Sequence, residues 1–372
     1  MPALADVVAL VHGWYPPAVA ADWDRVGLAV GDPAADVRRI VLAVDPVHAV
    51  VREAIGDGAD LLITHHPLLL RGVSSVAATT PKGRVVHDLI RAGCGLLTAH
   101  TNADAPAGGV SESLALALGL TDLRPLVPGP TERLAKLTTY VPAGDAEAVR
   151  AALSAAGTGA IGDYDSCSFS STGEGRFRPL RGARPAIGEV GSFEVVDEVR
   201  IETVLPISRH SAVVSALMGA HPYETPAYDV VEVAVEAAAD SGAGRVGRIE
   251  PTTLAAFAAT VAKALPRTAH GVRVSGGRGD RIETVAVLGG AGDGHLDDAR
   301  GEGVDAYVTS DLRHHPASEF REHAGPALVD ISHWAAEWTW LPVLRAQLAQ
   351  SLGDTVEVIV STTCTDPWDF RA

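Results

Sequence analysis

The segment DLLITHHP at residues 60–67 joins a short apolar run to two histidines and a proline. An apolar run of this length, bounded by polar residues, is typical of a buried strand. Pro67 disfavours helical geometry at the residue before it. We therefore expect a strand that ends near Thr64 and presents His65 and His66 at its carboxyl end, where open α/β sheets bind ligands. A pair of surface or capping histidines is the alternative.

Similar apolar runs flank this strand on both sides in the sequence. They lie at residues 39–44 and 95–98, with helical patterns at 48–55 and 85–93 between the strands. Near-continuous apolar runs separated by helices are typical of a parallel sheet that is covered on both faces. The last third repeats this style, with runs at residues 284–288, 306–309, 327–331 and 356–360. The fold class expected is α/β, with a mixed or parallel sheet core covered by helices.

The middle of the chain has a different pattern, which predicts a separate domain. A strand at residues 136–141 is followed by a helix at 146–156, two longer strands that end with 194–205, a helix at 211–219 and a strand at 228–235. The order β-α-β-β-α-β is that of the ferredoxin-like split unit. Its exit, AAADSGAGRVG at 237–247, is typical of a linker. We expect a discontinuous core, 1–132 and 243–372, interrupted by an insert at 133–242.

Composition limits the class of protein and its partners. A chain of 372 residues with 47% hydrophobic and 20% charged residues can build two sizeable cores. The net charge of −16 argues against a nucleic-acid partner, because phosphates need a basic face. Neither a targeting segment nor an apolar run near the roughly 20 residues of a membrane helix is visible. Cys94, Cys167 and Cys364 lack metal-site or disulfide spacing and fit a reducing cytoplasm.

Two further segments place His and carboxylate residues after predicted strands. HTNAD at 100–104 follows the strand at 95–98, so His100 and Asp104 should lie at the same sheet edge as His66. A helix N-cap is the alternative for Asp104. DISHWAAE at 330–337 follows the strand at 327–331, and a helix would place His333 and Glu337, four residues apart, on one face. A surface His–Glu pair is the alternative there.

These segments together predict a site for two divalent metal ions. Five side chains give two ions three ligands each only if carboxylates bridge, and bridging places the ions roughly 3.5–4 Å apart. Imidazole and carboxylate ligands suit zinc, which we expect first, but also iron, manganese or cobalt. Two ions that share a water generate a hydroxide nucleophile near neutral pH, which is the chemistry of hydrolases. The expected ligands are His65, His66, Asp104, His333 and Glu337.

Other candidate residues have weaker patterns. His100 and His315 could line the pocket as general acid or base, although His314 and His315 could equally cap a helix. The glycine run at 289–294 matches no phosphate-binding motif, so a tight turn is favoured over an anion site. HPYE at 221–224 is expected to form a structured turn in the insert. Asp24 closes over the metal site or forms part of a turn.

Six segments resemble the family of GTP cyclohydrolase 1 type 2 homologues, also called Nif-three-like proteins. They are DWDRVGLAVGDP (22–33), LLITHHPLLL (61–70), TAHTNADAPAGGVSESLA (98–115), VAVLGGAGDG (285–294), VTSDLRHH (308–315) and DISHWAAEW (330–338). The resemblance implies the same five metal ligands, a ring-shaped homohexamer and a PII-like insert that contains HPYETPAYDVV (221–231). The chain departs from the family pattern at Ser332 and Ser310, where glycine is usual, and has an added His314.

Two functions remain open. The first is a metal-dependent hydrolase of a nucleotide or related compound, with GTP ring opening by attack at the purine C8 as the version that the resemblance names. His100 or His315 would move protons in that reaction. The second is a metal-handling or regulatory protein without turnover, whose insert senses a small molecule. The hydrolase predicts turnover that is lost when any metal ligand is mutated. The metal-handling protein predicts reversible metal exchange without turnover of any nucleotide.

Overall fold

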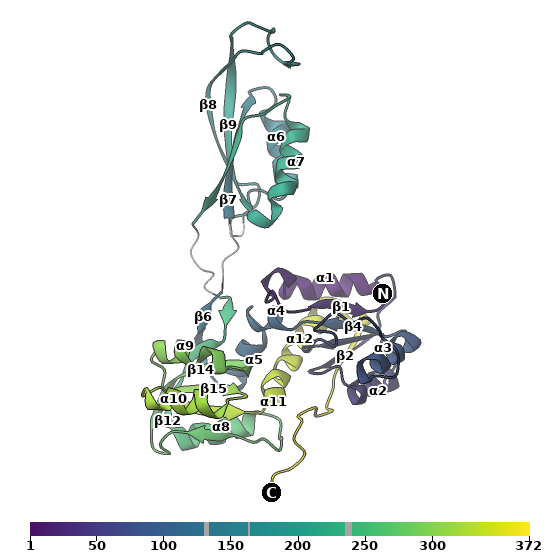
Figure 1. Ribbon diagram of the computed structural model, residues 1–372, viewed down its shortest axis with the longest axis vertical. Helices are drawn as coiled ribbons and strands as arrows, with labels where there is room; N and C mark the ends of the chain where they lie inside the picture. Colours follow the sequence, from purple (N-terminus) through teal and green to yellow (C-terminus); the bar gives the residue numbers. More distant parts are fainter. Residues whose placement is uncertain (130–133, 163, 235–239) are drawn as a thin grey trace. The chain divides into compact units, whose positions relative to one another are not determined.

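A computed structural model of the chain describes residues 1–129, 134–162, 164–234 and 240–372 (Figure 1). The chain divides into two compact units: a core unit, Met1–Gly129 with Ala238–Ala372, and an insert unit, Pro130–Ala237. The predicted boundary at 132–133 and residues 237–239 of the expected linker lie outside the described residues. The predicted boundary at 242–243 falls within a short strand of the core unit, β11 (Gly242–Ala243), which pairs with β6 (Val127–Pro128).

The first sheet of the core unit has five strands in the order β1-β4-β3-β2-β17. Its four parallel strands correspond within a residue to the predicted runs, and β1 adds an antiparallel edge. Helices α2 (His48–Gly56) and α3 (Pro81–Ala92) connect the parallel strands along the chain. The strands are β1 (Gly27–Val30), β2 (Arg39–Ala43), β3 (Leu61–Thr64), β4 (Gly95–Thr98) and β17 (Glu357–Val360).

The second sheet has six strands in the order β13-β16-β15-β14-β12-β5. Its central strands β14, β15 and β16 are parallel, as the apolar runs predict, while the outer strands are antiparallel. The core unit is therefore a mixed α/β structure with two main sheets. The strands are β5 (Thr121–Arg124), β12 (Arg245–Thr253), β13 (Arg273–Ser275), β14 (Arg281–Ala291), β15 (Ala306–Ser310) and β16 (Ala327–Ile331).

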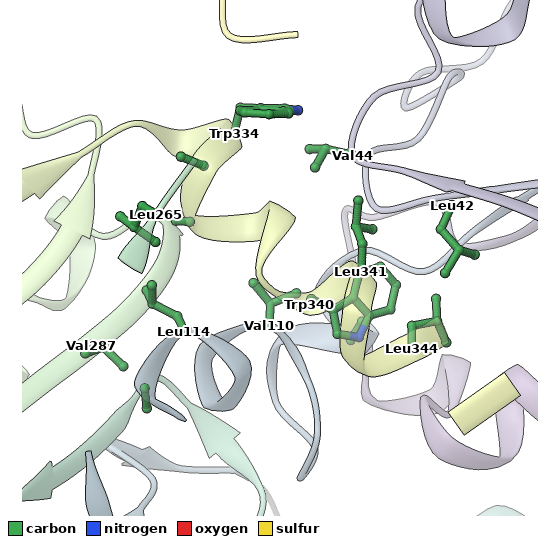
Figure 2. Packing of buried hydrophobic residues seen from close by; sticks show 14 of the residues in the cluster. Leu42, Val44, Val110, Leu114, Leu265, Val287, Trp334, Trp340, Leu341 and Leu344 are labelled. Atoms are coloured by element: carbon green, nitrogen blue, oxygen red, sulfur yellow. The ribbon is translucent and has the colours of Figure 1, made fainter. Parts of the chain in front are cut away.

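One hydrophobic core joins the two sheets, and helices α11 (His333–Trp338) and α12 (Trp340–Leu352) run through it. Figure 2 shows Leu341 and Leu344 of α12 beside Leu42 of the first sheet, with Val287 of the second sheet on the other side. Trp334 and Trp340 are buried in this core, so they are packing residues rather than an exposed stacking platform. The remaining helices of the core unit are α1 (Leu4–Trp14), α4 (Thr101–Asp104), α5 (Val110–Ala117), α8 (Leu254–Ala264), α9 (Leu296–Gly301) and α10 (His314–Glu322).

The insert unit has one antiparallel sheet of four strands in the order β10-β7-β9-β8. Helices α6 and α7 pack on it around their own hydrophobic core, which includes Leu137, Val149 and Leu217. The elements are β7 (Leu134–Pro142), α6 (Ala146–Ala155), β8 (Ser168–Phe177), β9 (Glu194–Pro206), α7 (His210–Ala220) and β10 (Tyr228–Val233). None of the helices in the described part of the chain has the length and apolarity needed to span a bilayer.

A buried arginine fastens the start of β12 to the loop after α4. The Arg245 side chain is 1% exposed, and its Nε donates to Glu112 Oε2 at 3.1 Å. Its other nitrogens donate to the carbonyl oxygens of residues on both segments, namely Gly242, Gly244, Ala105 and Pro106. Since Ala105 directly follows Asp104, this arginine also fixes the backbone beside a predicted metal ligand.

Replacing Arg245 by methionine should lower the free energy of unfolding by about 3–5 kcal/mol, because Glu112 loses its cationic partner and several carbonyl groups lose a buried donor. Urea unfolding followed by circular dichroism measures this change. Arg248→Met is the matched control: Arg248 lies on the same strand, but it is exposed and pairs with Glu283 at the surface. Equal stability losses in the two variants would contradict the anchoring role.

Candidate metal centre

Four histidines meet where strands of both sheets end. His65 and His66 directly follow β3, His100 follows β4, and His333 begins α11 after β16. The ring centroids of neighbouring histidines lie 5.1–5.5 Å apart. One ring nitrogen each from His65, His66 and His100 lies within 4.8 Å of the others. The structure thus brings together the histidines of segments that are far apart in sequence.

The Nδ1 atom of every one of these histidines already has a hydrogen-bond partner. When the ring is neutral and Nδ1 carries the proton, Nε2 keeps the lone pair that a metal ion needs, so these partners fix the ligand geometry. His65 donates to the Ala99 carbonyl oxygen at 2.9 Å, His66 to Asp45 Oδ1 at 2.7 Å, His100 to Asp24 Oδ1 at 2.8 Å and His333 to Asp311 Oδ2 at 2.7 Å.

Glu337 lies at the centre of the histidine cluster. Its Oε1 is 2.7 Å from His333 Nε2 and 3.4 Å from His65 Nε2, and its Oε2 is 3.1 Å from His66 Nε2. The residue is only 2% exposed. His333, Glu337 and His66 form a second group whose ligand atoms lie within 4.8 Å of one another. A buried carboxylate that lies beside three imidazoles through both oxygens could act as a metal ligand together with them.

The glycine turn after β14 makes room for this carboxylate. Gly290 has a φ of +83°, and a Cβ atom at this position would lie 3.1 Å from Glu337 Oε1. A side chain there would combine backbone strain with crowding of the site. The turn that the sequence predicts is therefore also part of the wall around Glu337.

Asp104 approaches the same cluster from α4. Its Oδ1 is 3.7 Å from His65 Nε2 and is buried without a hydrogen-bond partner, although other parts of the side chain are partly exposed. The helix that follows, α5, has Gly109 as its N-cap, so Asp104 does not cap it. A buried carboxylate oxygen beside an imidazole, without a donor, is what a bound cation would satisfy. Glu337 Oε2 is likewise a buried carboxylate oxygen of the site that has no hydrogen-bond partner.

The carboxylates strongly favour positive charge at this site. Burial alone would lower the pKa of His66, but Glu337 and Asp45 raise it to about 11. For His333, burial is likewise overcome by Glu337 and Asp311, and the pKa rises to about 10. Burial would raise the pKa of Glu337, yet the surrounding imidazoles hold it well below its ordinary value. Burial raises the pKa of Asp104 to about 6. A bound divalent cation would supply the positive charge that these groups favour.

His315 lies elsewhere on the core unit. It is exposed at the start of α10, where its ring contacts that of His314 with the centroids 5.1 Å apart. Within the described residues it has no hydrogen bond or ring contact with the cluster. The role of His315 as a pocket acid or base therefore stays a prediction, and its exposed position at the start of α10 does not add to it.

Sequence reasoning missed the acidic residues that orient the histidines. Asp45 follows β2 and Asp311 follows β15, the same strand-end position that singled out His65 and His100. Asp24, for which a turn was equally expected, is buried and accepts hydrogen bonds from His100 and from the Thr101 amide at 3.0 Å. A search for carboxylates, and not only histidines, at the carboxyl ends of the predicted strands would have found Asp45 and Asp311.

A cavity of about 370 Å³ adjoins the cluster. His66 and His333 line it together with His270 and the chain near its carboxyl end, including Asp366 and Trp368. This last segment is tied to the centre, since Thr365 donates to Asp45 and Ser332 donates to Asp366. An ion held by His66 and His333 would therefore face the cavity.

Replacing Asp45 by alanine should weaken metal binding about 10–100-fold, since His66 loses the acceptor that fixes its ring. Competition with a chromophoric chelator measures the affinity. Asp57→Ala is the control. Asp57 lies at the surface just after α2, so this substitution removes the same charge at a position away from the site. An Asp45→Ala affinity equal to that of the control would mean that Asp45 does not orient a ligand.

Fold and site define an α/β protein with a histidine–carboxylate cluster that could hold a metal ion. The chain belongs to the Duf34/NIF3 (NGG1p interacting factor 3) family, whose model matches residues 2–367. A Mycobacterium leprae protein named GTP cyclohydrolase 1 type 2 homolog is 47% identical over 373 residues, covering 99% of this chain and 96% of that protein. A Bacillus subtilis protein of the same name is 39% identical over 368 residues, covering 98% and 97%.

A solved structure shows the same overall fold. The Bacillus cereus protein related to NIF3 aligns with a TM-score of 0.80 at 36% identity, covering 100% of this chain and 99% of that one. The family that the sequence motifs resemble is thereby confirmed.

Proposed function

We propose that this chain is a metal-dependent hydrolase of a nucleotide or related compound, with two divalent ions bound per chain. The observation that carries the proposal is the arrangement of four imidazoles, each oriented through Nδ1, around two buried carboxylate oxygens that lack hydrogen donors. Such ions, when bound, polarise a substrate and lower the pKa of water, which hydrolysis at neutral pH requires.

His100 completes the ligand count in this proposal. The sequence suggested five ligands, His65, His66, Asp104, His333 and Glu337, with His100 as a proton carrier. Since His100 Nδ1 is engaged by Asp24 and its ring lies against His65 and His66, we assign its Nε2 to an ion instead. Six ligands then provide three per ion. The charge also fits two divalent ions, because five carboxylates surround the imidazoles: Asp24, Asp45, Asp104, Asp311 and Glu337.

The proton carrier that we propose is His270, which lines the cavity beside His66 and His333. Its Nε2 donates to Asp330 Oδ2 at 3.0 Å, which leaves Nδ1 as a proton acceptor. Burial would raise the pKa of Asp330, but hydrogen bonds from His270, the Leu312 amide and Arg273 keep it below its ordinary value. A charged Asp330 holds the imidazole in place and stabilises it when it takes up a proton.

His270→Gln should lower kcat about 10²–10⁴-fold, the usual contribution of a general acid or base, with metal content unchanged. Steady-state assays on the substrate found below, with elemental analysis of the same samples, measure both quantities. His295→Gln is the control, because His295 pairs with Asp298 at the surface. A kcat within a factor of about two of wild type would remove His270 from the mechanism.

A nucleotide is proposed as substrate because the relatives carry the name GTP cyclohydrolase 1 type 2 homolog. Purified protein loaded separately with zinc, iron, manganese or cobalt is incubated with nucleoside triphosphates, nucleotides and phosphoesters, and products are identified by mass spectrometry. Turnover that disappears after chelation and returns with metal supports the proposal. Full metal loading without turnover on any compound favours the metal-handling alternative.

The same proposal includes the finer expectations from the sequence. We infer a homohexamer, a cytoplasmic location and a PII-like insert that folds as its own domain. The separate hydrophobic core of the insert unit and its β-α-β-β-α-β order support the last of these. Light scattering of the purified chain tests the hexamer.

A further inference from the structure

The insert unit contains a pocket of about 500 Å³ on its sheet, independent of the metal centre. Aromatic side chains form part of its wall, namely Tyr140, Phe177 and Tyr223. Glu198 of β9 lies in it, while Glu174 and Glu224 also contribute to the lining. A volume in the range of about 300–1,000 Å³ with aromatic walls and a few polar groups is typical of a small-molecule site.

The HPYE turn builds the aromatic wall. His221 is 6% exposed, its Nε2 donates to the Tyr140 carbonyl oxygen at 2.9 Å, and its Nδ1 accepts from the Tyr223 amide at 3.1 Å. Both ring nitrogens are thus used to fix the backbone on either side of the pocket. The Tyr223 ring contacts the rings of His221 and Phe177, with centroids 5.1 and 5.6 Å away. The turn that the sequence predicts therefore holds Tyr223 at the pocket.

Glu198 is a carboxylate without a cationic partner among the described residues. The Tyr223 hydroxyl donates to its Oε1 at 2.8 Å, and burial together with this carboxylate raises the pKa of Tyr223. Its Oε2 lies over Gly175 of the neighbouring strand, where a Cβ atom would be only 2.2 Å away. The absence of a side chain at Gly175 lets the carboxylate lie against the pocket wall.

The arginines that line the pocket have other partners. Arg176 Nε donates to Glu174 Oε1 at 2.6 Å, and the Arg178 guanidinium lies 4.8 Å from the Phe193 ring centroid. The lining therefore has three carboxylates against two guanidinium groups, with Glu198 unpaired. Within the described residues, these carboxylates do not form a group of three potential metal ligands. The chemistry favours an organic cation over an anion or a metal ion.

We propose that this pocket binds a small organic cation with a planar apolar body. The cationic group would contact Glu198, and the body would pack against Phe177 and Tyr223, because aromatic faces attract cations and a carboxylate strengthens the contact. This makes the insert unit a ligand-binding module in its own right.

Benzamidine, benzamide and benzoate are suitable probes, since they share one ring and differ in charge. Titration of each against the full chain, followed by ligand-observed NMR, should show benzamidinium binding at least about tenfold more tightly than benzamide, with benzoate weakest. Equal affinity for benzamidinium and benzamide, or no binding of benzamidinium, would overturn the proposal.

Glu198→Gln should reduce benzamidinium affinity by about tenfold and leave benzamide affinity unchanged. Asp197→Asn is the matched control: it removes one charge from the adjacent residue of β9, whose side chain points to the opposite face of the sheet. Tyr223→Phe keeps the ring and frees Glu198, so it should bind benzamidinium at least as well as wild type. Unchanged affinity in Glu198→Gln would exclude this carboxylate as the binding group.

Discussion

The Glu337→Gln variant is expected to lose both metal ions, whereas the wild-type protein should carry about two divalent ions per chain. Glu337 contacts the Nε2 atoms of His65, His66 and His333 through its two oxygens. Glutamine has nearly the same shape, but it loses the negative charge and offers one acceptor instead of two. Elemental analysis after dialysis against trace metal measures the occupancy.

Asp104→Asn should lose metal less completely, since among the described histidines Asp104 approaches one, His65, at 3.7 Å, whereas Glu337 approaches three. Glu322→Gln, at the exposed end of α10, is the charge-matched control and should keep both ions. Circular dichroism spectra must match wild type, so that metal loss is not a consequence of unfolding. Full occupancy in both Glu337→Gln and Asp104→Asn would refute the metal assignment, and with it the proposed function.

The histidines of this centre were predictable because local rules determine their positions. A strand-end motif places His65, His66 and His100 at one edge of a sheet, and the four-residue spacing places His333 and Glu337 on one face of a helix. The acceptors behind them were not predicted. Asp45 and Asp311 each reach a histidine 21 or 22 positions away in the chain, so their roles depend on how neighbouring strands pair.

In the core sheets, too, the strands with a local sequence pattern were predictable, and the strands that depend on tertiary pairing were not. The buried parallel strands β2, β3, β4, β15 and β16 have continuous apolar runs and lie where the sequence predicts them. The edge strand β5 is mostly exposed, and β13 has only three exposed residues, so neither has the apolar pattern of a buried strand. The second sheet is mixed because β12 pairs antiparallel with β14 and β13 pairs antiparallel with β16. The pairing partners of β5 and β13, namely β12 and β16, lie far away in the chain.

Replacing Pro130–Ala237 with a short Gly/Ser loop should leave a folded core unit that still binds metal. Described residues on the two sides of the cut pair within the core unit, because the Gly129 amide donates to the Ser241 carbonyl oxygen at 2.9 Å and β6 pairs with β11. Domains are tolerated as insertions where such chain ends lie close together. The cut must spare Gly242, whose carbonyl oxygen accepts a hydrogen bond from Arg245.

The shortened protein should keep the wild-type number of ions per chain, since all six proposed ligands lie on the core unit. It should lose benzamidinium binding completely, because the lining of the insert pocket is removed with the segment. Elemental analysis and the same NMR titration separate these two results. A cooperatively folded but metal-free product would show that the insert helps to build the centre, whereas retained benzamidinium binding would place the cation site on the core unit.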